Sequence, residues 1–208
     1  MLTEWIDKVR TRLDERSRGL IGRYRKTAVL VPMVVLENGE TGVLFEERSH
    51  TMRRQPGEIS FPGGHFEEEN DVNEEATAVR ETSEELGTPR QTIQVLGELD
   101  VFVASTGLLV YPYVGYLQSY PRLDPNKDEV ERVFVVELTR LLAAKPPVYT
   151  VPLRPDPPSD FPYHLIPKGR DYSWRISQTE QWFYEFDNHV IWGLTARILT
   201  HFLELLRA

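Results

Sequence analysis

The stretch of sequence that decides the fold runs from Gly63-Gly64 to Arg80-Glu81-Thr82-Ser83-Glu84-Glu85-Leu86-Gly87. The pattern predicts a glycine turn followed by a helix over residues 73–86, with Gly87 as its C-cap. Each helical residue turns about 100° and rises about 1.5 Å, so the three glutamates of the second run share one face. Like charges this close repel one another, and a divalent cation removes the repulsion. The stretch therefore points to bound Mg²⁺ or Mn²⁺.

A solvated acidic helix face without a metal is the alternative interpretation of these glutamates. On such faces the carboxylates usually pair with lysines four residues away. The positions one turn away here are Thr77, Ala78, Thr88 and Pro89. None of them is a lysine, so we favour the metal interpretation. Arg80 lies four residues before Glu84 and is expected to pair with it, which would fix the rotamer of that carboxylate.

The same residues resemble the Nudix box, in which a glycine and a glutamate precede Arg-Glu-aliphatic-x-Glu-Glu-x-Gly-aliphatic. The matching residues are Gly64, Arg80, Glu81, Glu84, Glu85 and Gly87. The loop is two residues longer than the usual pattern. The expected first glutamate therefore falls on Asn70 when counted from the glycine, and on Val72 when counted from the arginine. Thr82 and Thr88 stand where aliphatic residues are usual, but the metal-binding second half of the box is intact.

A second motif precedes the box. Residues 44–64 read LFEERSHTMRRQPGEISFPGG. This run resembles the signature L-L-x-x-R-S-x-x-[ML]-R-x-H-x-G-[EQ]-[VI]-[AS]-F-P-G-G of the coenzyme A pyrophosphatase branch of Nudix hydrolases. Gln55 replaces its usual histidine. Further segments that look like this branch are 111–115, 128–130 and 182–199, so the resemblance covers roughly residue 26 to the end of the chain.

The resemblance implies a fold and a set of roles. The fold is an α+β fold, an α/β/α sandwich with a mixed sheet and flanking helices. The implied metal ligands are Glu81 and Glu85, with Glu84 as a further ligand or as a holder of metal-bound water, and the carbonyl oxygen of Gly64. Arg80 is implied to orient the catalytic carboxylate Glu84. Glu129 sits where many Nudix enzymes hold another glutamate near the metals, so it is interpreted as a ligand, as the general base, or as an ordinary loop acid.

Basic residues on the second motif are candidates for binding substrate. Arg48 and Arg53 fall on the motif, and arginine presents a fork that matches phosphate oxygens. Arg54 lies off the motif and is interpreted as an ordinary surface arginine. Gln55 can donate a hydrogen bond to a phosphate, but it cannot gain charge as histidine can. The five histidines have no ligand spacing and are assigned no role.

Composition sets the remaining limits. The chain has 208 residues and no cysteine, so we expect one domain over residues 1–208 and no thiol chemistry. Its net charge is −8, and six acidic residues crowd into residues 67–75, which we interpret as a solvated loop. Such a charge disfavours nucleic acid as a partner and allows a small nucleotide such as coenzyme A. The N-terminal segment lacks an apolar signal core and no stretch is long enough to cross a membrane, which predicts a cytoplasmic protein.

The hydrophobic patterns predict the other elements. An amphipathic helix over 2–14, with Leu2, Trp5, Ile6, Val9 and Leu13 on one face, is expected to pack on a core. Strands are expected over 28–36, 42–45, 58–61, 94–103, 109–117 and 133–138. The segment 146–167 holds eight of the fifteen prolines and is expected to be rigid and irregular, and 181–208 to end in a helix. Aromatic residues near the end are assigned to the core or to a homodimer contact: Trp174, Trp182, Phe183 and Tyr184.

Three functions are weighed on this basis. The first is metal-dependent hydrolysis of coenzyme A or an acyl derivative to adenosine 3′,5′-bisphosphate and 4′-phosphopantetheine or its acyl form. The second keeps the chemistry and changes the substrate to another nucleoside diphosphate derivative, such as ADP-ribose or a dinucleotide. Its support is the replaced histidine at Gln55 and the altered loop around Asn70. The third is a nucleotide-binding protein without catalysis.

Overall fold

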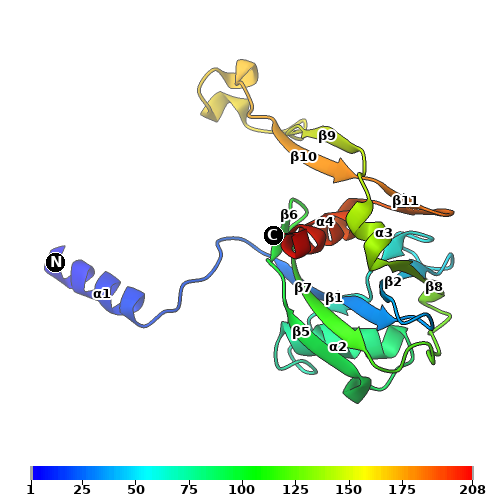
Figure 1. Cartoon of the computed structure of the whole chain (residues 1–208). Helices are drawn as coiled ribbons and strands as arrows, with labels where there is room; N and C mark the ends of the chain where they lie inside the picture. The colour runs from blue at the N-terminus through cyan, green and yellow to red at the C-terminus, as the bar shows by residue number, and fades with distance from the viewer. Residues whose placement is uncertain (1, 208) are drawn as a thin grey trace.

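A mixed eight-stranded sheet lies at the centre of the protein (Figure 1). The computed structural model describes residues 2–207, apart from the side chain of Leu2, so residues 1 and 208 lie outside the description. Its elements are α1 (Leu2–Asp14), β1 (Arg25–Val35), β2 (Thr41–Arg48), β3 (Ile59–Ser60), β4 (Gly63–His65), α2 (Glu74–Glu85), η1 (Arg90–Thr92), β5 (Ile93–Glu98), β6 (Phe102–Ala104), β7 (Leu108–Leu117), β8 (Val130–Glu137), α3 (Leu138–Ala143), β9 (Val148–Leu153), η2 (Tyr163–Leu165), η3 (Gly169–Asp171), β10 (Ser177–Trp182), β11 (Tyr184–Phe186), β12 (His189–Ile191) and α4 (Gly193–Arg207).

The sheet is built around β1. It pairs in parallel with β7 along most of its length. On its other side it pairs with β4 through its first half and with β2 through its last residues, both antiparallel. The order of the main path is β3-β2-β1-β7-β5, with β8 also on β2 and β6 also on β7. This arrangement places the short strands β3 and β4, which flank Pro62, in the middle of the sheet.

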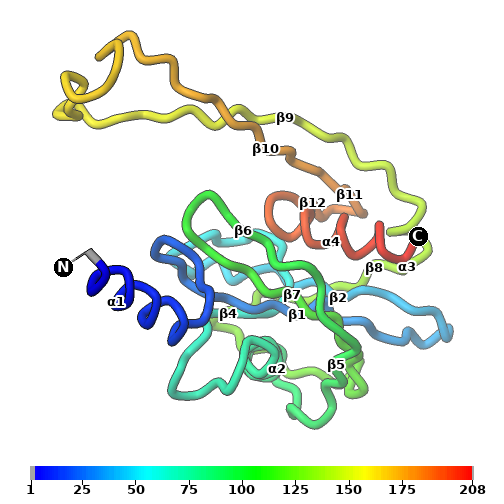
Figure 2. The backbone as a smooth tube through the Cα atoms, turned by 90° about the vertical axis from the view of Figure 1, so that its left-hand side faces the viewer, coloured from blue at the N-terminus to red at the C-terminus, as the bar shows by residue number. Residues whose placement is uncertain are grey.

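Helix α2 covers one face of the sheet, and α3 and α4 cover the other, which gives three layers (Figure 2). Successive residues of a strand point to opposite faces, and the strands are apolar on both sides. Leu30 and Leu44 therefore pack with Ala78 and Leu86 on the face covered by α2. On the opposite face, Val31 of β1 and Val43 and Phe45 of β2 pack with residues of α3 and α4. The α/β/α sandwich predicted from the sequence is confirmed.

Helix α2 begins and ends as the sequence predicts. The side chain of Asn73 accepts a hydrogen bond from the Ala76 amide at 2.8 Å and caps the N-terminus. Gly87 follows the helix in the left-handed region, at φ 58°. The Thr88 amide donates back to the Ser83 carbonyl at 3.1 Å, the bond typical of a glycine C-cap. These caps fix the register of the helix and thus the face on which its carboxylates lie.

Three segments differ from the sequence expectation. The strand expected over 94–103 is divided into β5 and β6, both paired with β7. The proline-rich segment contains a regular strand, β9, which pairs with β10 to form a two-stranded arm. Its prolines do not prevent this because each strand of the arm has a free edge. The small β11–β12 hairpin was also not expected, whereas the terminal helix is present as α4.

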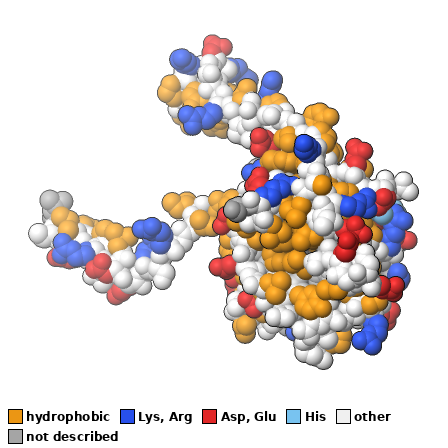
Figure 3. All heavy atoms as spheres, in the orientation of Figure 1, with side chains coloured by type: hydrophobic (Ala, Val, Ile, Leu, Met, Phe, Trp, Pro, Cys, Tyr) orange, Lys and Arg blue, Asp and Glu red, His pale blue; other side chains and the backbone are white. Residues whose placement is uncertain are grey.

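The expected packing of the N-terminal helix on a core is wrong for the described side chains. Trp5, Ile6, Val9 and Leu13 are each more than half exposed, and α1 lies apart from the sheet layers (Figures 1 and 3). Trp174 also lies outside the core, because it packs on Phe161 and Tyr172 in the tip of the two-stranded arm. Tyr184 is in the core. Among residues 2–207, no helix combines the length and apolar character needed to cross a membrane.

The C-cap of α2 provides a test of this fold. A Cβ at Gly87 would collide with the backbone of Asp124, whereas a Cβ at Gly39, also in the left-handed region at φ 82°, meets nothing within 4 Å. We expect Gly87→Ala to destabilise the protein by about 3 kcal/mol or more, because clash adds to backbone strain. Gly39→Ala should cost only the strain, about 1 kcal/mol. Denaturant unfolding measures both, and equal losses would contradict the predicted contact.

Candidate active site

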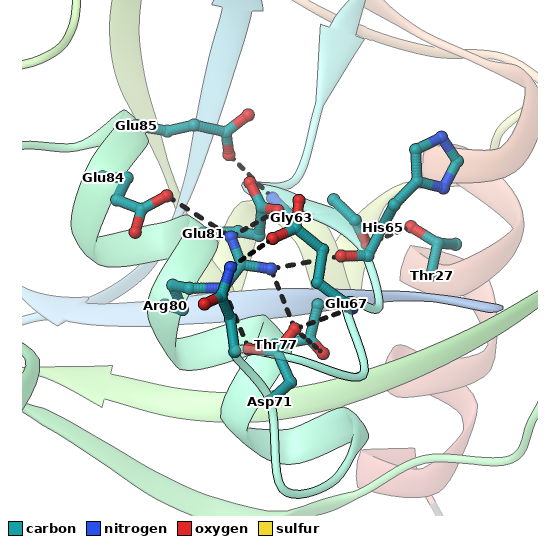
Figure 4. Close-up of polar contacts among 12 residues, drawn as sticks. Thr27, Gly63, His65, Glu67, Asp71, Thr77, Arg80, Glu81, Glu84 and Glu85 are labelled. Atoms are coloured by element: carbon teal, nitrogen blue, oxygen red, sulfur yellow. Dashed lines mark hydrogen bonds and ion pairs between the residues drawn. The ribbon is translucent and has the colours of Figure 1, made fainter.

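The candidate active site lies where the β3–β4 turn meets α2 (Figure 4). The Gly63 amide donates a hydrogen bond to Oε2 of Glu85 at 2.7 Å. The carboxyl group of Glu81 lies against the Cα of Gly64, in space that a Cβ would fill. The turn thus needs glycine for close approach, as expected from the sequence. The carbonyl oxygen of Gly64 accepts from the Thr27 hydroxyl, and a carbonyl has a second lone pair for another partner.

Arg80 is the best-connected side chain of the site, and its main partner is Asp71. Arg80 Nε and Nη2 each bind one oxygen of Asp71 at 2.9 Å, a bidentate pair with both side chains buried. Arg80 Nη1 binds Glu81 Oε1 at 2.9 Å, and Nη2 also donates to the His65 carbonyl at 3.1 Å. The expected pair with Glu84 exists, but at 3.4 Å it is the longest of these contacts. Arg80 therefore joins the loop, the turn and the helix.

The interpretation of the whole acidic segment as a solvated loop is wrong at Asp71. Its side chain is buried and accepts further bonds from the Glu67 amide at 3.1 Å and the Thr77 hydroxyl at 2.9 Å. The hydrogen bonds from Arg80 hold the pKa of Asp71 well below its ordinary value. Asp71 lies between Asn70 and Val72, the two positions at which the motif would place its first glutamate. An acidic residue between these two positions was the sequence signal that could have identified Asp71.

The three glutamates of α2 occupy different environments. Glu84 is exposed, and its other oxygen is 3.2 Å from Arg90 Nη2. Glu81 is half-buried, and burial raises its pKa against the opposing effect of Arg80. Glu85 is buried, and its pKa is raised well above the ordinary value by burial and then by the nearby carboxylate of Glu46. The helix thus presents one exposed carboxylate and two that are unfavourable as free anions.

Glu46 is a further carboxylate close to Glu85, and the sequence interpretation missed it. It lies on β2 and is 1% exposed, and burial raises its pKa to about 7. The Ser60 hydroxyl donates to its Oε1 at 2.9 Å, while Oε2 has no hydrogen-bond partner. Strand alternation was the available signal, because Glu46 must point to the same face as Leu44, the face that α2 covers.

The candidate substrate residues lie at the end of β2 (Arg48) and on the loop between β2 and β3 (Arg53 and Gln55). Arg48 is half-buried, and its Nε is buried without a hydrogen-bond partner. Arg53 and Gln55 are exposed, and Gln55 donates to Glu58 at 2.8 Å. Glu129 reaches this loop through its carbonyl oxygen, which accepts from the Ser49 amide at 2.7 Å.

Two further features surround this loop. The Glu129 side chain accepts from Asn126 at 3.2 Å. A cavity of about 420 Å³ opens beside the loop, on the α4 side of the sheet, and is lined in part by Gly57, Glu58, Phe183 and Trp192. The predicted substrate residues therefore lie on the end of β2 and on the following loop, which adjoins both Glu129 and an aromatic-lined cavity.

The donor set is chemically suited to a hard divalent cation. The site concentrates carboxylate oxygens, one of them buried and unpartnered, beside a backbone turn. In the part of the chain that is described, no three acidic or histidine side chains already converge as a ready-made metal cage. The reason is visible in Figure 4, where Glu81 is turned to Arg80 and Glu85 to the Gly63 amide. Cation binding would require these carboxylates to exchange or share their present partners.

Comparison with known proteins identifies the family. A model of the NUDIX domain matches residues 25–154. The chain is 33% identical over 198 residues to the uncharacterized Nudix hydrolase NudL of Photorhabdus laumondii, covering 95% of this chain and 94% of that protein. It is 37% identical over 149 residues to the peroxisomal coenzyme A diphosphatase NUDT7 of Mus musculus, covering 69% of this chain and 61% of that protein.

A solved structure agrees with this assignment at the level of fold. The MutT/nudix family protein from Enterococcus faecalis has a TM-score of 0.51 and 13% identity, covering 97% of this chain and 69% of that one. The chain therefore belongs to the Nudix hydrolase family, enzymes that hydrolyse diphosphate bonds and generally use divalent metal ions. The resemblance seen in the glycine turn and the carboxylate helix is confirmed.

The buried ion pair of the site gives a stability test. Asp71→Ala leaves the Arg80 guanidinium buried without its bidentate partner, so we expect a loss of about 3–5 kcal/mol. Glu69→Ala removes an exposed acid from the same loop and should change stability by no more than about 0.5 kcal/mol. Urea unfolding of both variants measures the difference. Equal stabilities would mean that Asp71 is, after all, a solvated loop acid.

Proposed function

We propose that this protein hydrolyses the diphosphate of coenzyme A or an acyl-coenzyme A, using Mg²⁺ or Mn²⁺. The products would be adenosine 3′,5′-bisphosphate and 4′-phosphopantetheine or its acyl form. The observation that carries the proposal is the proximity of two motifs: Ser49, next to Arg48, is hydrogen-bonded to the Glu129 backbone, and the charges of Arg48 and Glu129 both act on the buried carboxylate of Glu46. The relative that is named as a coenzyme A diphosphatase supports the same substrate.

The chemistry asks for positioning and charge stabilisation more than for covalent catalysis. A divalent ion held by Glu81, Glu85 and the Gly64 carbonyl would neutralise the diphosphate and lower the pKa of the attacking water. Arg80 keeps Glu81 in place through its bond to Oε1. Glu84 and Glu129 are the two candidates for accepting the proton of the water that attacks phosphorus.

Substrate recognition is assigned to the loop between β2 and β3. Arg48 and Arg53 would bind the phosphates of coenzyme A, since a guanidinium pairs with two phosphate oxygens at once. The unpartnered Nε of Arg48 is a donor available for this purpose. Gln55 would donate to a phosphate in exchange for its present bond to Glu58. The neighbouring aromatic-lined cavity offers space for an uncharged part of the substrate.

A different nucleoside diphosphate derivative is the second candidate substrate, and Gln55 is the observation that favours it. The glutamine is exposed, its backbone has a φ of 51°, and it cannot carry the charge of the histidine usual in the motif. Loss of one cationic contact would weaken selection of a substrate with an additional phosphate. A third candidate, nucleotide binding without catalysis, requires binding with no turnover at saturating metal.

Three further expectations from the sequence stay as proposals. They are a single Nudix domain over residues 1–208, a homodimer, and a cytoplasmic location without nucleic acid or membrane partners. The mouse relative is named as peroxisomal, which is a statement about that protein.

Removal of a proposed metal ligand is the first test of activity. Glu85→Gln should lower the turnover of coenzyme A by at least about 100-fold, since even the outer partners of bound metals contribute 10–100-fold. The matched control is Glu75→Gln, which neutralises an exposed glutamate at the start of the same helix and should retain activity. Chromatography of the products at saturating Mg²⁺ or Mn²⁺ measures both. Near-normal turnover by Glu85→Gln would refute the ligand assignment.

Comparison of substrates tests the specificity. We expect kcat/KM for coenzyme A to exceed that for dephospho-coenzyme A and ADP-ribose by at least about tenfold, because one lost charge-assisted phosphate contact corresponds to roughly 1.5–3 kcal/mol. Arg48→Ala and Arg53→Ala should lower kcat/KM for coenzyme A by a larger factor than they lower kcat/KM for ADP-ribose. A ratio near one would favour the second candidate, and binding of all three without products would favour the third.

A further inference from the structure

Glu46 lies on the same side of the sheet as the proposed metal ligands. On β2, Leu44 packs in the core beneath α2, whereas Phe45 packs in the core beneath α4. Glu46 lies two residues after Leu44 on the strand and points to the same face of the sheet. Its carboxylate therefore points into the layer that contains Glu85. Its neighbour Glu47 points to the opposite face, where its Oε2 binds Arg132 at 2.6 Å. The strand therefore carries two adjacent glutamates with different surroundings.

Residues 60–63 are hydrogen-bonded to both Glu46 and Glu85. In the β2–β3 register Glu46 is opposite Ser60, and the Ser60 hydroxyl fixes Oε1 at 2.9 Å. Three residues later the Gly63 amide fixes Oε2 of Glu85 at 2.7 Å. The same turn thus orients both carboxylates. Each has an oxygen that the turn does not bind, and for Glu46 this is Oε2, which is buried and has no hydrogen-bond partner.

A fully buried glutamate with an unpartnered oxygen is costly unless something compensates it. The fold supplies little compensation, because the hydrogen bonds of Arg80 go to Asp71, Glu81, Glu84 and the His65 carbonyl, and none goes to Glu46. The positive charge of Arg48 lowers the pKa of Glu46, whereas the negative charges of Glu81 and Glu129 raise it. A divalent cation would satisfy the free oxygen and the surplus charge together.

We propose that Glu46 supplies its Oε2 as an additional carboxylate ligand of the divalent-metal site that contains Glu81 and Glu85. This inference rests on the proposed function, since it adds a residue to the same site. The Nudix box itself does not include Glu46, which comes from a strand nearly forty residues before the helix glutamates. Ser60 acts as the positioning residue that holds Glu46 in the required rotamer.

The test is Mn²⁺ binding to the full-length protein without substrate, measured by calorimetry and by the electron paramagnetic resonance of free Mn²⁺. Glu46→Gln keeps the shape of the side chain and an acceptor for the Ser60 hydroxyl, but removes the charge. We expect it to weaken Mn²⁺ binding by at least about tenfold, the lower end of what partners of bound metals contribute. The matched control is Glu47→Gln, on the same strand and the opposite face, which should bind Mn²⁺ like the wild type.

Stability without metal separates ligation from a structural role. Because the substitution replaces a buried acid by a neutral isostere, metal-free Glu46→Gln should unfold at the same urea concentration as the wild type or higher. Added Mn²⁺ should then raise its melting temperature less than it raises that of the wild type. A Glu46→Gln protein that is unfolded or clearly less stable without metal would overturn the inference, because Glu46 would then serve the fold.

Glu85→Gln distinguishes the two levels of failure. If Glu85→Gln loses Mn²⁺ affinity while Glu46→Gln retains it, the inference about Glu46 is wrong and the proposed metal site stands. If the wild type binds no Mn²⁺, or Glu85→Gln binds it like the wild type, the metal site of the proposed function is wrong and Glu46 has no role in it. Weakened binding by Glu46→Gln and Glu85→Gln, with Glu47→Gln unchanged, supports both.

Discussion

The buried guanidinium of Arg80 connects three segments of the site to one another. It binds both oxygens of Asp71, one oxygen of Glu81 and the carbonyl of His65, which come from the loop, the helix and the strand β4. A lysine could not replace it, because the ammonium group lacks the planar fork needed to bind both oxygens. The bidentate partner is Asp71, so two of the hydrogen bonds of the guanidinium hold the loop. Little positive charge is therefore left to balance the helix glutamates.

This surplus charge gives the site its chemical character. Carboxylates that are buried near one another are unfavourable as anions, and the pKa values of Glu46, Glu81 and Glu85 are all raised for that reason. The fold keeps them together because the caps of α2 fix its register and the β3–β4 turn approaches the helix closely. The cluster is thus a destabilised arrangement that a cation would stabilise, as expected when function conflicts with stability.

The layers followed from the resemblance to the Nudix family, and local patterns in the sequence were sufficient to predict α2 with its glycine C-cap and the grouping of its glutamates. They failed where the outcome depends on distant partners. Asp71 looked like its acidic neighbours, and only burial beside Arg80 distinguishes it. Glu46 lies just past the strand expected over 42–45, so the alternation that places it on the face of Leu44 was not extended to it. The exposed helix α1 shows the opposite failure, because an amphipathic pattern predicts an apolar face without stating what covers it.

The residues proposed for substrate binding and those proposed for bond cleavage belong to different parts of the molecule. The proposed metal ligands lie on α2 and the glycine turn, whereas Arg48 ends β2 and Arg53 and Gln55 lie on the loop between β2 and β3. The loop is joined to the Glu129 backbone by the Ser49 amide, and β2 is joined to the turn by the Glu46–Ser60 bond. A replacement at an exposed loop position such as Gln55 therefore leaves these internal bonds intact. If Gln55 binds substrate as proposed, specificity can change at that position without disturbing the carboxylate cluster, and the family assignment alone does not determine the substrate.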